Sequence, residues 1–488
     1  MPVPDSSPHR ADVAVVGAGA AGLFTALTAA SAGARVALVS ATPLARTASY
    51  WAQGGLAAAL AADDSPEQHL ADTERAGRGL VRRSAAKVLT DEAADRVHEL
   101  VAMGVSFDAD RFGHLALGLE GGHSIRRIVH AGGSATGRRV VRQLSALAVE
   151  HPRIEVLEGS PAAAIWTDDD TGACRGLVLE DGRALTTRGV VICTGGTAAL
   201  WSRTTNPPGS LGTGLLLAHR AGAELADLEF MQFHPTAVTG VGGREGFLIT
   251  EAIRGEGATL HNADGERFVD ELLPRDEVSR AVHLEMRRTG ARSVGLDMRD
   301  VDPLLFPNVV AALRESGLDV TRELIPVAPA AHYGMGGIVT DLDGRSTVPG
   351  LYAVGEAACT GLHGANRLAS NSLSECCVFG RRAALAALDD PSPAGDPPPP
   401  AVAPLPVPGR ETKDALWRNA GIERTHDDLV TLRLDPYPLA RLIGASALLR
   451  EESRGAHFRA DFPEQDSALD QRHTVVAPGD APRFEAWS

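Results

Sequence analysis

A glycine-rich turn near the start of the chain restricts its fold more than any other feature. Asp12–Val16 (DVAVV) is typical of a buried strand, and Gly17–Gly22 (GAGAAG) follows it directly and opens an apolar helical stretch. In such a turn Gly17 permits the tight bend, Gly19 lets the backbone approach a pyrophosphate, and Gly22 lets the helix pack on the strand. The pattern predicts a βαβ unit with a dinucleotide at the helix N-terminus.

Three further strand patterns belong to the same predicted sheet. Arg35–Ser40 (RVALVS) gives the second strand, and Ser40 stands where an acidic residue usually contacts the ribose. Val190–Gly196 (VVICTGG) and Gly350–Gly355 (GLYAVG) come much later in the chain and also end in glycine turns. We therefore expect a discontinuous nucleotide-binding domain with an insertion between its parts.

Composition narrows the class of protein. A chain of 488 residues is too long for one core, and 44% hydrophobic with 22% charged residues indicates a globular protein. A formal charge of −15 argues against nucleic acid as a partner, so an anionic ligand would need a locally positive cleft. Only two of the 47 basic residues are lysine, so a single arginine is informative only inside a motif.

Cysteine usage and hydropathy point to a cytoplasmic location. The five cysteines include no CxxC pair and no metal-ligand spacing, which predicts free thiols and no metal or iron–sulfur site. The apolar stretch Ala11–Ala34 is interrupted by glycines and lacks a basic start, unlike a signal peptide. No run of 18 apolar residues occurs, so we expect no membrane span.

Five short polar segments are scattered through the second half of the chain. Each supplies an imidazole, a hydroxyl or a guanidinium, and together they would suit a small molecule with two carboxylates. The segments are HPT (234–236), TEAIRGEG (250–257), PRD (274–276), AHYGMGG (331–337) and GLHGANRLASNS (361–372). With the nucleotide motif, they favour flavin redox chemistry on a dicarboxylic acid.

The predicted fold class is α/β. It comprises a Rossmann-like nucleotide-binding domain (1–227 and 333–390), interrupted by an α+β capping domain (228–332). A proline-rich, extended linker (391–409) leads to a small, shortened helical C-terminal domain (410–488). Helical spacing in that domain covers Ala415–Arg424 and Pro438–Ser453.

The order of these motifs resembles that of the succinate dehydrogenase/fumarate reductase flavoproteins. SYWAQGG (49–55) and CTGG (193–196) lie between the glycine-rich turn and the five polar segments, as in that superfamily. The resemblance runs from Asp12 to Ala387, and ESRGAHFRADFP (452–463) extends it into the tail. It implies an FAD cofactor.

The resemblance also implies which residues contact FAD. Covalent members carry a flavin-linked histidine before the AQGG turn, whereas this chain has Ala48 there, so we expect non-covalent FAD. Thr213 stands where the superfamily has an FAD-contacting Asp. The expected contacts are Gly17, Ala18, Gly19, Ala20, Ala21, Gly22, Ser40, Ser49, Tyr50, Trp51, Ala52, Gln53, Gly54, Gly55, Pro161, Ala162, Gly195, Gly196, Thr213, Glu356, Asn371, Ser372 and Leu373.

Within the superfamily the chain is most similar to the L-aspartate oxidases. LEGGHSIRRIVHAGGSATG (119–137) resembles the segment of that family that supplies a glutamate, here Glu120, opposite the substrate ammonium. The resemblance implies oxidation of L-aspartate to iminoaspartate by hydride transfer to flavin N5. Reoxidation by O2 or fumarate follows, and the reaction is the first step of quinolinate and NAD biosynthesis, with a possible link to quinolinate synthase. A soluble fumarate reductase or succinate dehydrogenase relative and a non-enzymatic flavin-binding protein are the alternatives.

The resemblance assigns roles in the pocket as well. Arg367 would grip one substrate carboxylate, and the other would be held by His234 and Thr250. The shell would be completed by His332, Ser370 and Gln232. Arg275 matches the proton-transfer arginine, either through a relay with Glu251 and Arg254 or, because arginine keeps its proton in proteins, acting electrostatically.

Overall fold

A five-stranded parallel sheet forms the centre of the molecule. The computed structural model describes residues 9–395 and 397–488. The strand order is β18 (Leu351–Ala353), β11 (Gly189–Ile192), β2 (Val13–Val16), β3 (Val36–Ser40) and β7 (Ile154–Glu158), and every neighbouring pair is parallel. The late strand β11 thus lies between β2 and the still later β18, which confirms the Rossmann-like fold.

Strand β2 contributes side chains to two cores because successive residues of a strand point to opposite faces. Val13 and Val15 pack in the core beneath α1 (Ala20–Ser31) and α9 (Asn371–Asp389). Ala14 and Val16 pack in the core on the other face. Both faces of this parallel sheet are therefore covered, as its continuous hydrophobic strands require.

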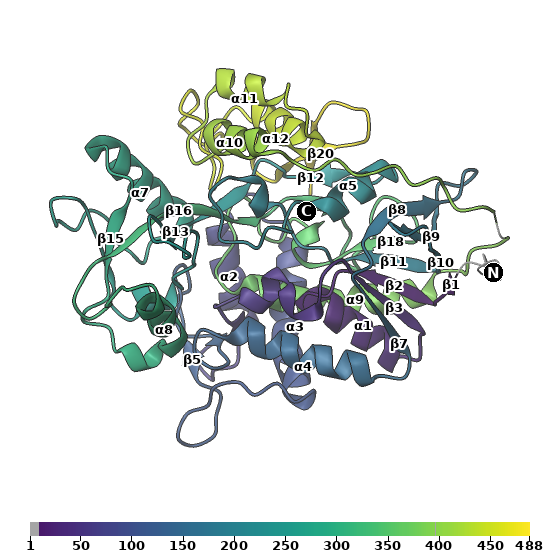
Figure 1. Cartoon of the computed structure of the whole chain (residues 1–488), viewed down its shortest axis with the longest axis horizontal. Helices are drawn as coiled ribbons and strands as arrows, with labels where there is room; N and C mark the ends of the chain where they lie inside the picture. The colour runs from purple at the N-terminus through teal and green to yellow at the C-terminus, as the bar shows by residue number, and fades with distance from the viewer. Residues whose placement is uncertain (1–8, 396) are drawn as a thin grey trace.

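Helices and a second sheet supply that cover (Figure 1). The core with α1 and α9 also contains residues of α3 (Arg83–Ala102) and α4 (Thr136–Glu150), while α2 (Pro66–Ala76) packs on α3. The other core contains residues of α5 (Thr213–Arg220) and of the sheet β1-β10-β9-β8. The strands of that sheet are β1 (His9–Arg10), β8 (Ala162–Thr167), β9 (Cys174–Leu179) and β10 (Ala184–Thr186).

An antiparallel sheet with its own core projects from the parallel sheet, on the left of Figure 1. Its order is β13 (Met231–Val238), β16 (Ile325–Gly334), β15 (Val294–Asp297) and β14 (Thr259–His261). The associated helices are α6 (Ala252–Gly255), α7 (Arg275–Thr289) and α8 (Pro307–Glu315). The buried apolar residues of this separate core all lie between Val238 and Val327. We propose this unit as the capping domain, residues 228–332.

Two smaller sheets tie distant segments together. One joins β4 (Leu56–Ala57), β6 (Ile128–Val129) and β5 (Leu117–Gly118), and the residues after β5 include Glu120. The other has the order β19 (Ala358–Cys359), β17 (Gly337–Val339), β12 (Leu225–Ala226), β20 (Arg472–Val476) and β21 (Arg483–Ala486). The end of the chain is thus hydrogen-bonded to the strand that precedes β13.

The C-terminal region is more varied than its helical spacing predicts. It contains α10 (Arg410–Asn419), α11 (His426–Leu432) and α12 (Pro438–Leu449), followed by strands β20 and β21. The seven residues of α11 are too few to show a clear apolar period, so the sequence predicts only two helices here. The described part of the proline-rich segment 391–409 has no helix or strand.

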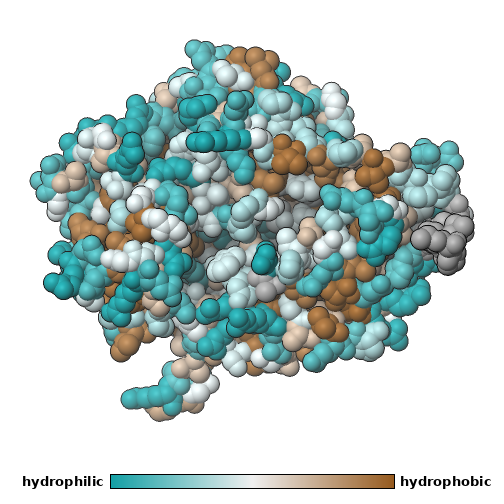
Figure 2. All heavy atoms as spheres, in the orientation of Figure 1, coloured by the Kyte–Doolittle hydropathy of each residue, from teal (hydrophilic) through white to brown (hydrophobic). Residues whose placement is uncertain are grey.

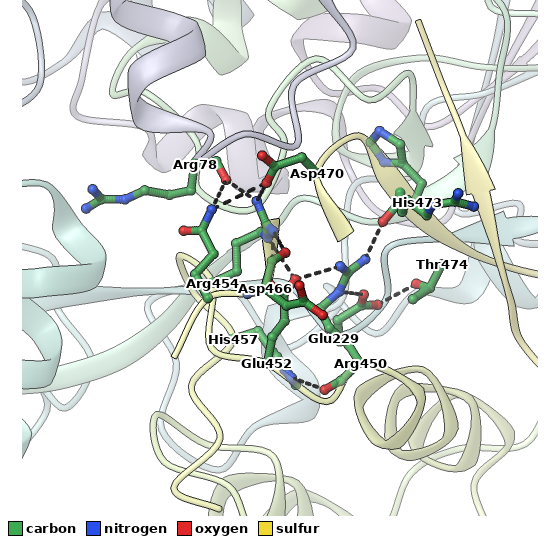
Figure 3. Close-up of polar contacts among 12 residues, drawn as sticks. Arg78, Glu229, Arg450, Glu452, Arg454, His457, Asp466, Asp470, His473 and Thr474 are labelled. Carbon is green, nitrogen blue, oxygen red and sulfur yellow. Dashed lines mark hydrogen bonds and ion pairs between the residues drawn. The ribbon is translucent and has the colours of Figure 1, made fainter. Parts of the chain in front are cut away.

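A network of buried charges attaches this region to the rest of the protein (Figure 3). Arg450 donates from Nε to Oε1 of Glu229 at 2.8 Å and from Nη1 to Glu452 at 3.0 Å. Arg454 continues the chain, donating to Glu452 at 2.7 Å and to the carbonyl oxygen of Arg78 at 2.5 Å. Because the Glu229, Arg450, Glu452 and Arg454 side chains are fully buried, each charge depends on its partner.

No described helix is long and apolar enough to cross a bilayer. On the face drawn in Figure 2, hydrophilic residues predominate and the apolar residues form small, separate groups.

Removing one member of the buried network should destabilise the protein strongly. We expect Arg450→Met to lower the free energy of unfolding by about 3–5 kcal/mol, because Glu229 would keep a buried charge without its ion-pair partner, while Glu452 would retain only Arg454. Urea unfolding followed by tryptophan fluorescence measures the change. Lys87→Met is the control: its ion pair with Asp91 has side chains 59% and 43% exposed, and its loss should change stability by about 0–1 kcal/mol. Equal effects of the two substitutions would contradict the role given to the network.

Candidate active site

The glycine-rich turn has the geometry that a pyrophosphate requires. Gly17 has φ +109°, and a Cβ there would lie 2.3 Å from the carbonyl oxygen of Cys193. A Cβ on Gly22 would lie 1.8 Å from the carbonyl oxygen of Gly17. At Gly19 the space is open except for the Ser49 hydroxyl at 3.0 Å. Gly17 and Gly22 are thus needed for packing, whereas Gly19 leaves the backbone accessible.

Helix α1 begins at this accessible point, and no side chain of the helix itself hydrogen-bonds to the amides of its first turn. Gly19 is the N-cap and has no side chain to cap the helix, and the first turn contains no acidic residue. The amide of Ala20 donates to the Ser49 hydroxyl at 3.1 Å, which brings the SYWAQGG segment against the turn. An anion at this N-terminus would be stabilised by the remaining amides and the helix dipole.

Several further residues that are predicted to contact FAD lie close to other parts of the site. The Gly196 position lies against Glu356, since a Cβ there would be 2.2 Å from Oε1, and Gly334 donates to the same oxygen at 3.0 Å. Burial raises the pKa of Glu356 to about 7. Gly55 donates to the Ser370 hydroxyl at 3.1 Å, which joins the QGG turn to the start of α9.

The outer predicted contacts lie at the carboxyl ends of the strands. Ser40 ends β3, and its carbonyl accepts from the amide of Ser160, next to Pro161 and Ala162. Thr213 begins α5 and is exposed. These residues lie along the edge of the parallel sheet where dinucleotides bind in such folds.

Some predicted contacts are engaged elsewhere. The side chain of Asn371 pairs with His69 Nε2 at 2.7 Å and donates to Thr73 at 3.1 Å, so only its backbone remains for a cofactor. Trp51 is 63% exposed, and the Tyr50 hydroxyl accepts from Arg142 at 3.1 Å. Gln53 donates to the carbonyl oxygen of Leu248 at 2.6 Å.

Two histidines face each other at the other end of the site. His234 on β13 and His332 on β16 lie on neighbouring antiparallel strands, with ring centroids 5.2 Å apart. Burial, together with the charge of Arg275, lowers the pKa of both imidazoles well below 6.5, so both are neutral at pH 7. The amide of Thr236 donates to His234 Nδ1 at 3.3 Å, which leaves the proton on Nε2. His234 therefore presents an N–H donor to the pocket.

Arg275, Glu251 and Arg254 form a buried chain of charges. Arg275 is the first residue of α7 and donates from Nε to Oε2 of Glu251 at 2.5 Å. Arg254 Nη2 lies 3.6 Å from the other oxygen of Glu251. The structure therefore brings together the three residues that the sequence assigns to proton transfer.

Gln232 connects the two principal arginines. Its Oε1 accepts from Arg275 Nη1 at 3.2 Å and from Arg367 Nη2 at 3.1 Å. Its Nε2 donates to the Asn366 side chain at 2.8 Å and to the Arg367 carbonyl at 2.9 Å. All four hydrogen-bonding positions of this amide are thus occupied, and Gln232 positions the arginines.

Arg367 has capacity for an anionic ligand. Its guanidinium lies 4.3 Å over the Tyr333 ring and donates to Ser372 at 2.7 Å. Its Nε is buried without a hydrogen-bond partner, and it forms no ion pair with any described residue. Burial and the charge of Arg275 lower the pKa of Arg367 to about 10, so it stays charged at pH 7. A ligand carboxylate would supply the missing partner.

Glu120 differs from these donors because its carboxylate is a hydrogen-bond acceptor. It is buried, with 3% of the residue exposed. Ser370, at the N-cap of α9 with φ +60°, donates to its Oε2 at 2.6 Å. Burial would raise the pKa of Glu120, but hydrogen bonds from His130 and Ser370 outweigh it, and the pKa falls to about 2. Glu120 is therefore a permanent anion at neutral pH.

The site as a whole suits a zwitterionic dicarboxylate. Arg254, Arg275 and Arg367 place three positive charges around two carboxylates, Glu120 and Glu251, inside a protein of net charge −15. The Thr250 hydroxyl makes no hydrogen bond to a described residue, and Thr250 is 4% exposed. Among the residues the structure describes, no group of histidines, cysteines or carboxylates is arranged to hold a metal ion.

Sequence reasoning misses several residues that support the site. Thr205 pairs with His332 Nδ1 at 2.8 Å, Asn366 accepts from Gln232, and His130 Nε2 lies 3.4 Å from Glu120. His130 stands in the same quoted segment as Glu120, which is the only sequence signal for it. Thr205 and Asn366 come from loops whose approach to the site depends on the tertiary fold.

The comparison with known proteins identifies the class. The family described as "FAD binding domain" matches residues 12–373, and that described as "Fumarate reductase flavoprotein C-term" matches residues 431–486. An E. coli quinol fumarate reductase superposes with a TM-score of 0.87 at 30% identity, covering 98% of this chain and 96% of that chain. A second quinol-fumarate reductase gives 0.88 at 29% identity, covering 99% and 98%. This fold and site define an FAD-binding flavoprotein.

Within that class the chain belongs to the L-aspartate oxidase family. It is 44% identical over 482 residues to the L-aspartate oxidase of Caulobacter vibrioides, covering 93% of both chains. It is 48% identical over 395 residues to that of Nostoc sp., covering 77% of this chain and 68% of the relative. The cofactor of the family is FAD, which the uncapped α1 terminus and the open backbone at Gly19 fit. With Ala48 at the position of the flavin-linked histidine, nothing indicates covalent attachment.

A methyl group at Gly19 should weaken FAD binding without disturbing the fold. Its φ of −76° suits alanine, but the new Cβ would occupy the backbone surface that the pyrophosphate must approach. We expect Gly19→Ala to raise the Kd for FAD at least about tenfold, which corresponds to about 1.4 kcal/mol. Fluorescence titration of the apoprotein measures the Kd. Gly209→Ala, where a Cβ meets open space, is the control; unchanged affinity in Gly19→Ala would refute the assignment.

Proposed function

We propose that this protein oxidises L-aspartate to iminoaspartate with bound FAD. The observation that carries this proposal is Glu120, a buried and permanently ionised carboxylate beside a pocket of arginine and imidazole donors. The donors complement the two substrate carboxylates, and Glu120 complements the ammonium. A pocket for succinate or fumarate alone would have no use for a buried anion.

The pocket residues would fix the substrate at both ends. Arg367 would bind one carboxylate with its unpartnered Nε and an adjacent nitrogen. His234 Nε2–H would donate to the other carboxylate, with Thr250 and His332 beside it. Two anchored carboxylates restrict rotation of the substrate and so convert binding into orientation for reaction.

FAD would be held by the residues already described. The α1 N-terminus, Ser49 and the 54–55 turn would bind it, and Glu356 with Gly196 would line its path. Bound FAD supplies the hydride acceptor for the carbon that bears the amino group. Glu120 would keep that amino group in a fixed direction, and the proposed capping domain would exclude water.

Arg275 would act at the neighbouring carbon. Its Nε proton is shared with Glu251, and Arg254 lies on the far side of that carboxylate. This row of three charged side chains supports a proton relay during fumarate reduction. Because arginine holds its proton strongly, electrostatic stabilisation of charge at the same carbon is the second role that the geometry supports.

The product suggests a place in metabolism. We infer that this oxidation is the first step of NAD synthesis and that iminoaspartate passes to a quinolinate-forming condensation, in the cytoplasm and in functional connection with quinolinate synthase. Fumarate fits the same donors and would serve, like O2, to reoxidise the cofactor. A soluble fumarate reductase or succinate dehydrogenase relative is the alternative function, and the position of Glu120 disfavours it.

Flavin bleaching tests the proposal directly. Mixing the yellow holoprotein anaerobically with L-aspartate should remove the visible flavin absorbance, because the substrate delivers two electrons and nothing reoxidises the cofactor. Stopped-flow absorbance records the rate. Bleaching by succinate but not by L-aspartate would establish the alternative function instead.

Neutralising Glu120 should separate the two substrates. Glu120→Gln removes the partner of the ammonium, so kcat/KM for L-aspartate should fall by about 100-fold or more, the equivalent of about 2.7 kcal/mol. Fumarate reduction should change by less than about fivefold, since fumarate has no ammonium. Steady-state assays with each substrate give the two ratios. Equal losses would remove Glu120 from ammonium recognition.

A further inference from the structure

The two carboxylate oxygens of Glu120 have unequal surroundings. Oε2 accepts a short hydrogen bond of 2.6 Å from Ser370, which itself accepts from the Gly55 amide. Oε1 has only His130, whose Nε2 lies 3.4 Å away. A Cβ on Gly54 would lie 3.6 Å from Oε1, so this oxygen borders the 54–55 turn, which would contact the cofactor. Oε1 is thus the atom of Glu120 with capacity for another donor.

His130 is built into the same small sheet. It follows β6, which pairs with β5 just before Glu120, and its carbonyl accepts from the amide of Asp108 at 2.8 Å. Its ring packs on Gly118, where a Cβ would lie 2.7 Å from Cε1. The side chain is 16% exposed, whereas that of Glu120 is 1% exposed. His130 therefore has a defined position and a route to solvent protons.

We propose that His130 is a positioning residue that sets the preference for L-aspartate through its contact with Glu120 Oε1. A hydrogen bond from His130 Nε2 holds Oε1 in place, so that Glu120 presents its charge to the substrate ammonium. This inference rests on the proposed oxidation of L-aspartate.

The other described charged groups around Glu120 do not hydrogen-bond to Oε1. Arg254, Arg275 and Arg367 interact with Glu120 electrostatically. The carboxylate of Asp108 binds the amides of Gly132 and Gly133. Among the described residues, His130 is thus the side chain in hydrogen-bonding contact with Glu120 Oε1.

The contact should affect two related ligands differently. Without His130, Oε1 is free to move, and affinity for L-aspartate should fall because its ammonium needs Glu120 in a fixed position. Succinate has no ammonium, so its affinity should change little. The ratio of succinate Kd to L-aspartate Kd should therefore fall at least about threefold in His130→Ala.

Anaerobic stopped-flow experiments on the holoprotein measure this ratio. The concentration dependence of flavin bleaching gives the apparent Kd for L-aspartate, and competition by succinate gives its Kd. In His130→Gln the ratio should stay within about twofold of its original value, because glutamine can donate a hydrogen bond to Glu120. In His130→Ala the apparent Kd for L-aspartate should rise at least about fivefold and that for succinate by less than about twofold, because only L-aspartate carries an ammonium.

A matched control and the failure outcomes complete the design. His114→Ala removes a histidine that is 81% exposed in the same region and should retain the original ratio. An unchanged ratio in His130→Ala, or equal losses of affinity for L-aspartate and succinate, would overturn the inference. Absence of bleaching by L-aspartate in the unmodified holoprotein would instead overturn the proposed function, so the two failures are distinct.

Discussion

The shared acceptor at Gln232 Oε1 is the contact on which the site depends. Arg275 comes from the start of α7 and Arg367 from the loop before α9. Two buried guanidinium groups repel each other, and a shared acceptor between them offsets that repulsion. Gln232 supplies it from β13, at the junction of the two regions. The pocket therefore exists only when the antiparallel unit packs against the parallel sheet, and neither part contains a complete site by itself.

Electrostatic selectivity arises from the order of charges within the pocket. The molecule is acidic overall, yet its interior places three guanidinium groups and two neutral imidazoles where carboxylates must bind. A single buried anion, Glu120, stands apart from Glu251, which Arg275 and Arg254 neutralise. Binding energy for an amino dicarboxylate thus comes from both signs of charge, and a ligand without an amine leaves one of them unsatisfied.

The sequence predicts those parts of the structure that depend on backbone conformation or on the order of motifs. The GAGAAG turn, the late parallel strands and the motif residues Arg275, Arg367, His234 and Glu120 can all be read from the sequence, because each follows from backbone conformation or a fixed motif order. The partner of each side chain cannot be read in this way. Thr205 pairs with a histidine 127 residues away, and Asn371 turns to His69, 302 residues away, instead of toward the cofactor. Helix α11 is too short for its periodicity to be visible, and β20 and β21 owe their existence to pairing with β12.

The attachment of the C-terminal region bears on how the protein is made. Glu229 stands three residues before Gln232, yet its partner Arg450 follows 221 residues later in the chain. While the ribosome is still synthesising the last segment, Glu229 is a carboxylate in a forming core without its counter-charge. The Glu229–Arg450 ion pair and the pairing of β12 with β20 can form only after residues 450–476 have been synthesised. The contacts that hold the start of the strand bearing Gln232 and His234 are thus completed late in synthesis, although most pocket residues are translated early.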